Sequence, residues 1–206
     1  MARLLYIEAS PASRLLIRST WRKVFLQAYQ EMHPQDELRS IDIWVADFPP
    51  FDAETIDAKF AILQKKELTA EQRARWDEVQ RISQRFNAAD KYIFSVPMWN
   101  FGIPYRLKHY IEVVTLAGEN WSWSRAEGYK SLLFGKKAVL VYASAGEYGV
   151  SDSSDFQKPY LRRWLNFIGV TDIQEISVAP TLADTHALAR TKCNAEATAV
   201  HGNVLK

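Results

Sequence analysis

The segment PMWNFGIP, residues 97–104, combines residue types that suit the binding of a flat ring. Pro97 and Pro104 stiffen the segment, and Gly102 permits a tight backbone path. The residues between them offer backbone N–H groups, one amide side chain and flat apolar surface: Met98, Trp99, Asn100 and Phe101. A planar heteroaromatic ring with hydrogen-bonding edges, such as an isoalloxazine, needs that combination. The alternative is that the three apolar members are only core residues.

A second segment, SPASRLLIRS at residues 10–19, has the composition of an anion site. It leads into a predicted helix, and the N-terminus of a helix offers free N–H groups and a positive dipole end. Hydroxyl groups and two guanidinium groups add to this, so the segment suits a phosphate monoester: Ser10, Ser13, Ser19 and Thr20, with Arg14 and Arg18. Plain capping of the helix by serine is the alternative interpretation.

Several nucleotide and hydrolase sites are disfavoured by missing residues. The segment at residues 10–19 has no G-x-G-x-x-G, and Gly135-Lys136 lacks the other residues of a phosphate-binding P-loop. The stretch around Ser144 reads YASAG and lacks the first glycine of the nucleophile elbow. The four histidines are scattered without ligand spacing, so no metal site is predicted.

The segment SAGEYG, residues 144–149, is small and turn-forming. Small residues such as Ala145 and Gly146 let the backbone approach the edge of a flat ligand. Three unusual loops therefore follow three apolar runs. In an open parallel sheet, ligands bind beyond the carboxyl ends of the strands, which is where these loops would lie.

The elements that must position these loops alternate along the chain. Apolar runs predict five strands, at 3–9, 38–44, 91–96, 137–144 and 172–178. Helical periodicity lies between them, Thr69 and Gln72 form a predicted capping box, and a last helix is predicted over 183–201. Residues 118–135, rich in Trp and Tyr, are predicted to be irregular. This order indicates an α/β fold with a doubly wound, flavodoxin-like parallel sheet, strand order 2-1-3-4-5 and helices on both faces.

Bulk composition places limits on location and partners. The 206 residues suit a single domain over 1–206, with 48% apolar and 24% charged residues and a net charge of +2. The basic residues are not clustered, so neither nucleic acid nor a membrane is expected as a partner. Only one cysteine is present, and no apolar run suits a membrane span or a signal peptide. A cytoplasmic location is expected.

With these loops in hand, the chain resembles the FMN-dependent NADH-azoreductase family of flavodoxin-like quinone reductases. The likeness runs nearly end to end. It is carried by PMWNFGIP (97–104), LKHYIEVVTLAG (107–118), GKKAVLVYASAG (135–146) and PYLRRWLNFIGVTDI (159–173). The resemblance implies a homodimer with FMN at the subunit interface. NADH or NADPH would give a hydride to FMN and leave, and a quinone or azo compound would then take it, in a ping-pong sequence.

The resemblance also assigns roles to residues. Ser10 would bind the phosphate, the turn Met98–Phe101 would hold the flavin ring, and Ser144, Ala145 and Gly146 would line its other edge. The family usually has a Ser-x-Ser pair near 16–18, where this chain has Leu-Ile-Arg, so either Arg18 or Ser19 would take over that phosphate contact. The family turn Ser-Arg-Gly-Gly is Ala-Ser-Ala-Gly at 143–146, which alters the contacts to the flavin's pyrimidine edge.

Three further aromatic residues, Trp121, Trp123 and Tyr148, are candidates for a wall on which small flat aromatic acceptors stack. The alternative is that the two tryptophans only fill the dimer interface. Two other functions stay open: an FMN-binding electron carrier without a nicotinamide pocket, and a non-enzymatic binding domain on the same fold. The length of the chain and the aromatic stretch at 118–135 favour the enzyme over the carrier.

Overall fold

The computed structural model describes residues 1–11, 16–149 and 152–181. Its centre is a five-stranded parallel sheet made of β1 (Arg3–Glu8), β2 (Glu37–Asp42), β3 (Lys91–Pro97), β6 (Lys137–Ala143) and β7 (Asp172–Val178). The order across the sheet is β2-β1-β3-β6-β7, and every neighbouring pair is parallel. In terms of the five predicted strands this is 2-1-3-4-5, so the predicted order is confirmed.

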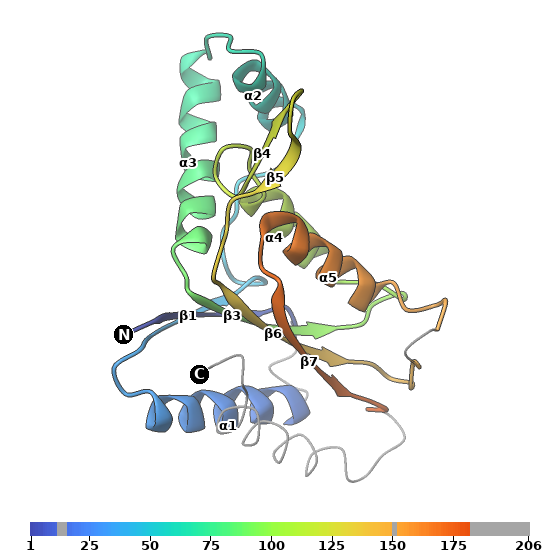
Figure 1. The fold of residues 1–206 in the computed structure, drawn as a ribbon. Coiled ribbons are helices and arrows are strands. Elements are labelled where there is room, and N and C mark those ends of the chain that lie inside the picture. Colours follow the sequence, from blue (N-terminus) through green and yellow to red (C-terminus); the bar gives the residue numbers. More distant parts are fainter. Residues whose placement is uncertain (12–15, 150–151, 182–206) are drawn as a thin grey trace.

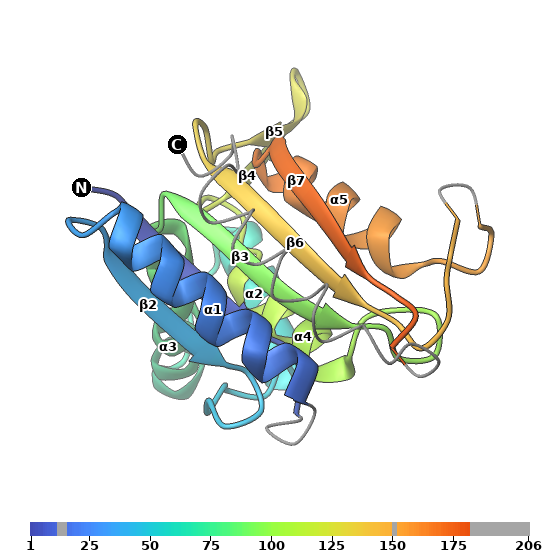
Figure 2. The same ribbon diagram turned by 90° about the horizontal axis from the view of Figure 1, so that it is seen from below.

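Within the described ranges, five helices connect or flank the strands: α1 (Leu16–Met32), α2 (Ala53–Leu63), α3 (Ala70–Asn87), α4 (Tyr105–Val114) and α5 (Gln157–Ile168). Helix α1 lies on one face of the sheet, and α3, α4 and α5 lie on the other (Figures 1 and 2). The predicted capping box is present, because the Thr69 hydroxyl accepts from the Gln72 N–H at 3.2 Å and the Gln72 side chain accepts from the Thr69 N–H at 3.1 Å. The helix predicted over 183–201 lies outside the described residues, so that helix stays a prediction.

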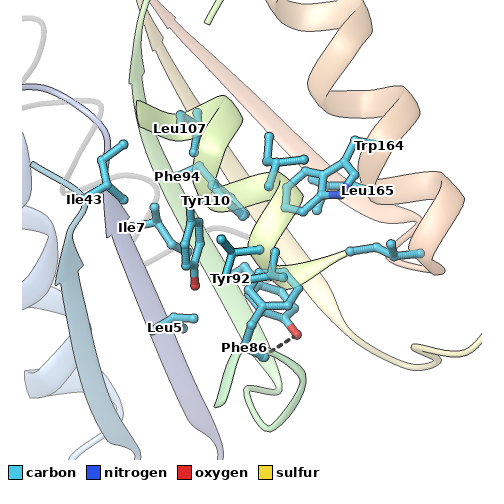
Figure 3. Packing of buried hydrophobic residues seen from close by; sticks show 14 of the residues in the cluster. Leu5, Ile7, Ile43, Phe86, Tyr92, Phe94, Leu107, Tyr110, Trp164 and Leu165 are labelled. Carbon is cyan, nitrogen blue, oxygen red and sulfur yellow. Dashed lines mark hydrogen bonds between the residues drawn. The ribbon is translucent and has the colours of Figure 1, made fainter. Parts of the chain in front are cut away.

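The sheet separates two apolar cores. Alternate residues of β1 and β3 point to opposite faces, as the period of a strand requires. Leu4, Tyr6 and Ile93 pack with α1, whereas Leu5, Ile7, Tyr92 and Phe94 pack with the helices of the other face. Figure 3 shows the larger core, where Tyr92 stacks on Phe86 and donates its hydroxyl hydrogen bond to the Phe86 carbonyl at 3.0 Å. Burial of almost every residue of β1, β3 and β6 explains their unbroken apolar runs.

The prediction that 118–135 is irregular is wrong. The structure has an antiparallel hairpin there, with β4 (Trp121–Ser124) paired to β5 (Gly128–Ser131). The hairpin turns through Gly128, which has φ 67°, and the Ser124 hydroxyl accepts from the Glu127 N–H at 3.1 Å. The signal was available in the sequence, because WSWS and GYKS alternate in polarity around a turn that ends in glycine.

A second glycine allows the hairpin segment to approach α5. Gly169 ends α5 with φ 106°, and a Cβ atom there would lie 2.3 Å from the Leu133 carbonyl oxygen. The Leu133 N–H donates to the Ile168 carbonyl at 3.0 Å. Only glycine allows both the backbone conformation and this close contact.

The amino edge of the sheet contains a buried ion pair. The Lys91 ammonium lies 3.4 Å from Asp36, and both side chains are about nine-tenths buried. Burial opposes ionisation of Asp36, but hydrogen bonds from the Ala2 N–H and the Tyr29 hydroxyl, together with the Lys91 charge, outweigh it and lower the pKa of Asp36. This cluster is far from the loops considered below, and it stabilises the fold.

No helix within the described ranges is both long enough and apolar enough to cross a membrane.

Candidate functional site

The loops after β1, β3 and β6 meet at one edge of the sheet. These three strands are adjacent and parallel, so their carboxyl ends lie side by side. The Ala9 N–H donates to the Ser95 carbonyl at 2.9 Å, and the Met98 N–H donates to the Ala143 carbonyl at 2.8 Å. The sheet ladder thus continues into the loops and fixes their starting points.

The loop after β3 is a tight two-residue turn. Trp99 and Gly102 exchange both backbone hydrogen bonds, each at 3.0 Å, and the two residues between them have positive φ, 46° at Asn100 and 69° at Phe101. The sequence predicts that Gly102 provides the backbone freedom, but the left-handed residues are Asn100 and Phe101 instead. Asparagine tolerates this conformation, whereas phenylalanine rarely adopts it. The turn therefore stores backbone strain of about 1–2 kcal/mol at a candidate site.

The strained turn presents its side chains outward. Trp99 is 37% exposed and Phe101 is 53% exposed, while Met98 is half-buried. The Phe101 carbonyl accepts from the Phe156 N–H at 2.9 Å, which joins the turn to the start of α5. Trp99 and Phe101 are therefore not core residues, and they offer the flat exposed surface that a ring ligand needs.

Trp44, in the loop after β2, joins this turn to the loop after β1. Its indole N–H donates to the Ala9 carbonyl at 3.0 Å, and its ring centroid lies 5.2 Å from that of Trp99 and 5.4 Å from that of Tyr105. Sequence reasoning missed Trp44. The available signal was that strand two neighbours strand one, so its carboxyl end opens on the same edge.

Helix α4 holds the loop that carries Trp44. Arg106 donates to two carbonyls of that loop, Nε to Ile43 at 2.9 Å and Nη2 to Ala46 at 2.8 Å. The His109 Nε2 lies 2.9 Å from the Pro49 carbonyl, which can only accept, so this nitrogen carries the proton. His109 thus faces the loop after β2 and supports it. Hydrogen bonds thus link α4 to the loop after β2, and the Trp44 indole links that loop to the loop after β1.

The loop after β6 is closed by its own side chain. The Ser144 hydroxyl donates to the Gly146 carbonyl at 2.7 Å, and the Ser144 carbonyl accepts from both the N–H and the hydroxyl of Thr181 at 3.0 Å. Ala145 and Gly146 are exposed, and no acceptor among the described residues takes their N–H groups. The loop therefore has two exposed backbone donors that a ligand could use.

A cavity of about 260 Å³ lies under this loop. Met98, Ser144, Tyr148 and Gln157 are among the residues that line it. Gln157 is fully buried; its Nε2 donates to the Val96 carbonyl at 3.3 Å, but its Oε1 has no partner in the described part of the chain. An unpaired buried acceptor of this kind costs about 1–3 kcal/mol, which a ring N–H or a water molecule would offset. The cavity brings Tyr148 to the predicted flavin residues.

The loop after β1 places Ser10 at the same edge, where it is 4% exposed. Its N–H donates to the Glu8 carboxylate at 3.2 Å, and the Tyr6 hydroxyl donates to the same carboxylate at 3.1 Å. Arg18 and Ser19 belong to the first turn of α1, which follows this loop. Their side chains lie outside the described residues, so the choice between them as the phosphate ligand stays a prediction.

A groove of about 840 Å³ runs between α4 and α5 beside the strained turn. Four aromatic residues from the turn and from the two helices are among those that line it: Trp99, Tyr105, Phe156 and Tyr160. Asn100 lines it as well, and Lys108 and Arg163 add positive charge. Ring compounds could therefore enter next to the predicted flavin loop.

The two hairpin tryptophans are not part of this edge within one chain. Trp121 packs on Tyr129 and on Phe167, with centroids 5.6 and 5.5 Å away. Phe167 is in the last turn of α5, whereas Phe156, which contacts the strained turn, precedes its first turn. The two residues are eleven positions apart, about 16 Å along the helix at 1.5 Å per residue. Trp123, 59% exposed, lies on the same hairpin.

Among the residues that line the small cavity, Tyr142 has a raised pKa. Its pKa is raised by burial and by the Glu175 carboxylate, which accepts a hydrogen bond from the Tyr142 hydroxyl at 3.0 Å. Tyr142 therefore stays protonated at neutral pH. No group of three or more His, Cys, Asp or Glu side chains in the described part of the chain could hold a metal ion.

These features fit FMN. The turn at 98–101 provides flat surface and an exposed amide, the loop at 144–146 provides backbone donors, and Gln157 provides an unpaired buried acceptor. The N-terminus of α1 follows strand β1, as a phosphate site requires.

Comparisons with known proteins agree with this geometry. A family model described as flavodoxin-like fold matches residues 2–200. An FMN-dependent NADH:quinone oxidoreductase from Desulfotalea psychrophila is 36% identical over 202 residues, 97% of this chain and 95% of that protein. One from Nitratidesulfovibrio vulgaris is 39% identical over 186 residues, 89% of this chain and 88% of that protein.

Among solved structures, an FMN-dependent NADH-azoreductase from Bacillus anthracis in complex with FMN superimposes with a TM-score of 0.85 at 26% identity, covering 97% of this chain and 98% of that one. The chain therefore belongs to the flavodoxin-like family that includes these FMN-dependent NADH:quinone oxidoreductases. The resemblance drawn from the sequence motifs is confirmed.

Proposed function

We propose that this member of the flavodoxin-like family is an FMN-dependent oxidoreductase that passes reducing equivalents from NADH to quinones and azo compounds. The observation that carries the proposal is the meeting of three loops at one sheet edge, with an exposed, strained Trp99–Gly102 turn in the middle. The names of the relatives, which are FMN-dependent NADH:quinone oxidoreductases, supply the reaction.

In this proposal the side chains and backbone of the three loops bind and orient the flavin. Met98, Trp99 and Phe101 would support one face and edge of the ring, and the Asn100 amide would bond its polar edge. The exposed N–H groups of Ala145 and Gly146 would donate to ring oxygens at the other edge, and Ser144 would hold their loop closed. FMN, when bound, supplies the hydride chemistry.

The phosphate would lie at the start of α1. The Ser10 N–H is already bonded to Glu8, so Ser10 would contribute its hydroxyl rather than its N–H. Arg18 or Ser19, in the first turn of α1, would complete the contact with the help of the helix dipole.

A homodimer would explain the placement of the hairpin aromatics. Trp121 and Trp123 are too distant along α5 to line the site of their own chain, but an exposed hairpin could reach the site of a second copy. Trp123 and Tyr129, which are 59% and 67% exposed, would then form the acceptor wall together with Tyr148 of the other chain. We further propose a single domain over 1–206, a doubly wound sheet and a cytoplasmic location. The donor is NADH or NADPH.

The test is the visible spectrum of the purified protein, followed by NADH-driven reduction of menadione. We expect a yellow protein with flavin absorption and steady turnover. A yellow protein with negligible turnover would instead indicate an electron carrier. A colourless protein that takes up no added FMN would indicate a binding domain, and either result would refute the proposed function.

A further inference from the structure

We propose that Lys108 and Arg163 form an anion subsite in the groove between α4 and α5, which selects flat aromatic acceptors that carry a carboxylate or sulfonate. This inference deepens the proposed function and rests on it, because it assumes that acceptors enter beside the Trp99–Gly102 turn. It assigns a substrate class to a groove whose walls are otherwise apolar.

The shape and lining of the groove favour a flat aromatic occupant. Its volume of about 840 Å³ is within the range of small-molecule sites, about 300–1,000 Å³. Trp99 and Tyr105 line it from the α4 side, and Phe156 and Tyr160 line it from the α5 side. Exposed rings on both walls can stack on the two faces or the edges of a ring system. The groove also borders Asn100, which is a predicted flavin contact.

The charge in the groove is of one sign. The two lining residues that are charged at neutral pH, Lys108 and Arg163, are both basic, and no carboxylate lines the groove within the described part of the chain. Arg163 is exposed and has no ion-pair partner among the described residues. The neighbouring Arg162 instead pairs with Glu175, outside the groove. A guanidinium group left without a carboxylate in an aromatic groove is suited to bidentate binding of an oxyanion.

Lys108 reinforces this positive charge. Its ion pair with Glu112 is on the same helix, one turn further along α4. Burial lowers the pKa of Lys108, and the positive charge of Lys59 lowers it further. Lys108 therefore adds positive charge to the groove although Glu112 pairs with it, and Arg163 is the basic group left for an anion. A neutral quinone could accept only a weaker hydrogen bond from these two side chains, because it carries no charge to pair with theirs.

The experiment compares methyl red, which carries a carboxylate, with its methyl ester, which has the same chromophore without the charge. We expect the ratio of kcat/KM for the acid to that for the ester to fall about tenfold in Arg163→Gln, the scale of a lost charged hydrogen bond. Arg163→Lys should retain part of the ratio. Arg162→Gln removes the same charge from the next position and should leave the ratio unchanged. An unchanged ratio in both Arg163→Gln and the Lys108→Gln/Arg163→Gln double variant would overturn the proposal.

A binding measurement separates this inference from the proposed function. Anthraquinone-2-sulfonate and uncharged 2-(hydroxymethyl)anthraquinone are titrated against the tryptophan fluorescence of the purified protein without NADH. We expect the sulfonate to bind more tightly, and Arg163→Gln to weaken the sulfonate about tenfold relative to the alcohol. If the protein shows no NADH turnover but keeps this difference, the function fails and the subsite stands. Equal effects on both ligands would refute the subsite even in an active enzyme.

Discussion

Trp44 is the residue whose substitution most directly tests how the site is held together. Its indole N–H donates to the Ala9 carbonyl at 3.0 Å, and its ring contacts Trp99 and Tyr105. Trp44→Phe removes the hydrogen bond and keeps an aromatic ring, whereas Trp44→Leu removes both kinds of interaction. Because Ala9 and Trp99 flank the proposed flavin site from two sides, we expect both variants to weaken FMN binding as well as stability.

The structure sets the expected magnitudes. A lost hydrogen bond of this kind costs about 1 kcal/mol, so Trp44→Phe should lower the free energy of unfolding by about 1 kcal/mol. Each aromatic pair adds about 0.5–1.5 kcal/mol, which brings Trp44→Leu to about 2–4 kcal/mol. If Trp44→Phe destabilises the FMN-bound protein by about 1 kcal/mol relative to the free protein, FMN affinity falls about fivefold.

The assay is urea unfolding followed by fluorescence, with and without saturating FMN, together with direct titration of FMN. A ligand that binds only the folded state raises stability in proportion to the logarithm of its concentration over Kd, so the two measurements check each other. Tyr105→Phe is the control, because it removes only a hydroxyl and leaves the edge contact with Trp44 in place. If both Trp44 variants lose stability but bind FMN as tightly as the wild type, Trp44 supports the fold and not the site.

Three further predictions concern individual positions. Gly169→Ala should lower the free energy of unfolding, measured by urea unfolding, by about 2–4 kcal/mol, because φ is 106° and the new Cβ would lie 2.3 Å from a backbone carbonyl oxygen. The control Gly102→Ala should change it by less than about 0.5 kcal/mol. Equal effects of the two substitutions would contradict this reasoning. If the Asn100 amide binds the flavin, Asn100→Ala and Asn100→Gly should both reduce flavin content, with a loss of about 1–3 kcal/mol in FMN binding. A loss in the alanine variant alone would show that the left-handed backbone at this position matters and the amide does not. The pKa of Asp36 is lowered in the folded state, so its ionisation stabilises the protein above the unfolded pKa near 3.8, and this contribution is lost as the pH falls through the lower folded value. Asp36→Asn should therefore cost about 1–3 kcal/mol at pH 7 and flatten the acid limb of a stability–pH curve, and an unchanged limb would count against the role of the Lys91 pair.

Much of the fold follows from local sequence rules. The unbroken apolar runs at 91–96 and 137–144 predict buried parallel strands, and Thr69 with Gln72 predicts where α3 begins. These predictions hold because burial on both faces and helix capping depend on residues close together in the chain. The three candidate loops were found for the same reason, since each directly follows a recognisable strand.

Other features depend on contacts between distant residues. Trp44 is 35 residues from Ala9 and meets it only because β2 and β1 are neighbours in the sheet. The left-handed backbone falls on Asn100 and Phe101 rather than Gly102, because the paired hydrogen bonds of Trp99 and Gly102 set the ends of the turn. No propensity scale places phenylalanine there, because the turn's closure overrides the local preference.

The residue types around the site were thus determined by the amino-acid sequence, and their assembly was decided by the tertiary structure. Strand periodicity specifies which side chains alternate and which loops follow, because it acts over a few residues. Which loops touch, and that Trp121 packs on Phe167 at the far end of α5, depend on sheet order and helix packing across the whole chain. Those long-range contacts place Lys108 and Arg163 in one groove, although 54 residues of intervening sequence separate them.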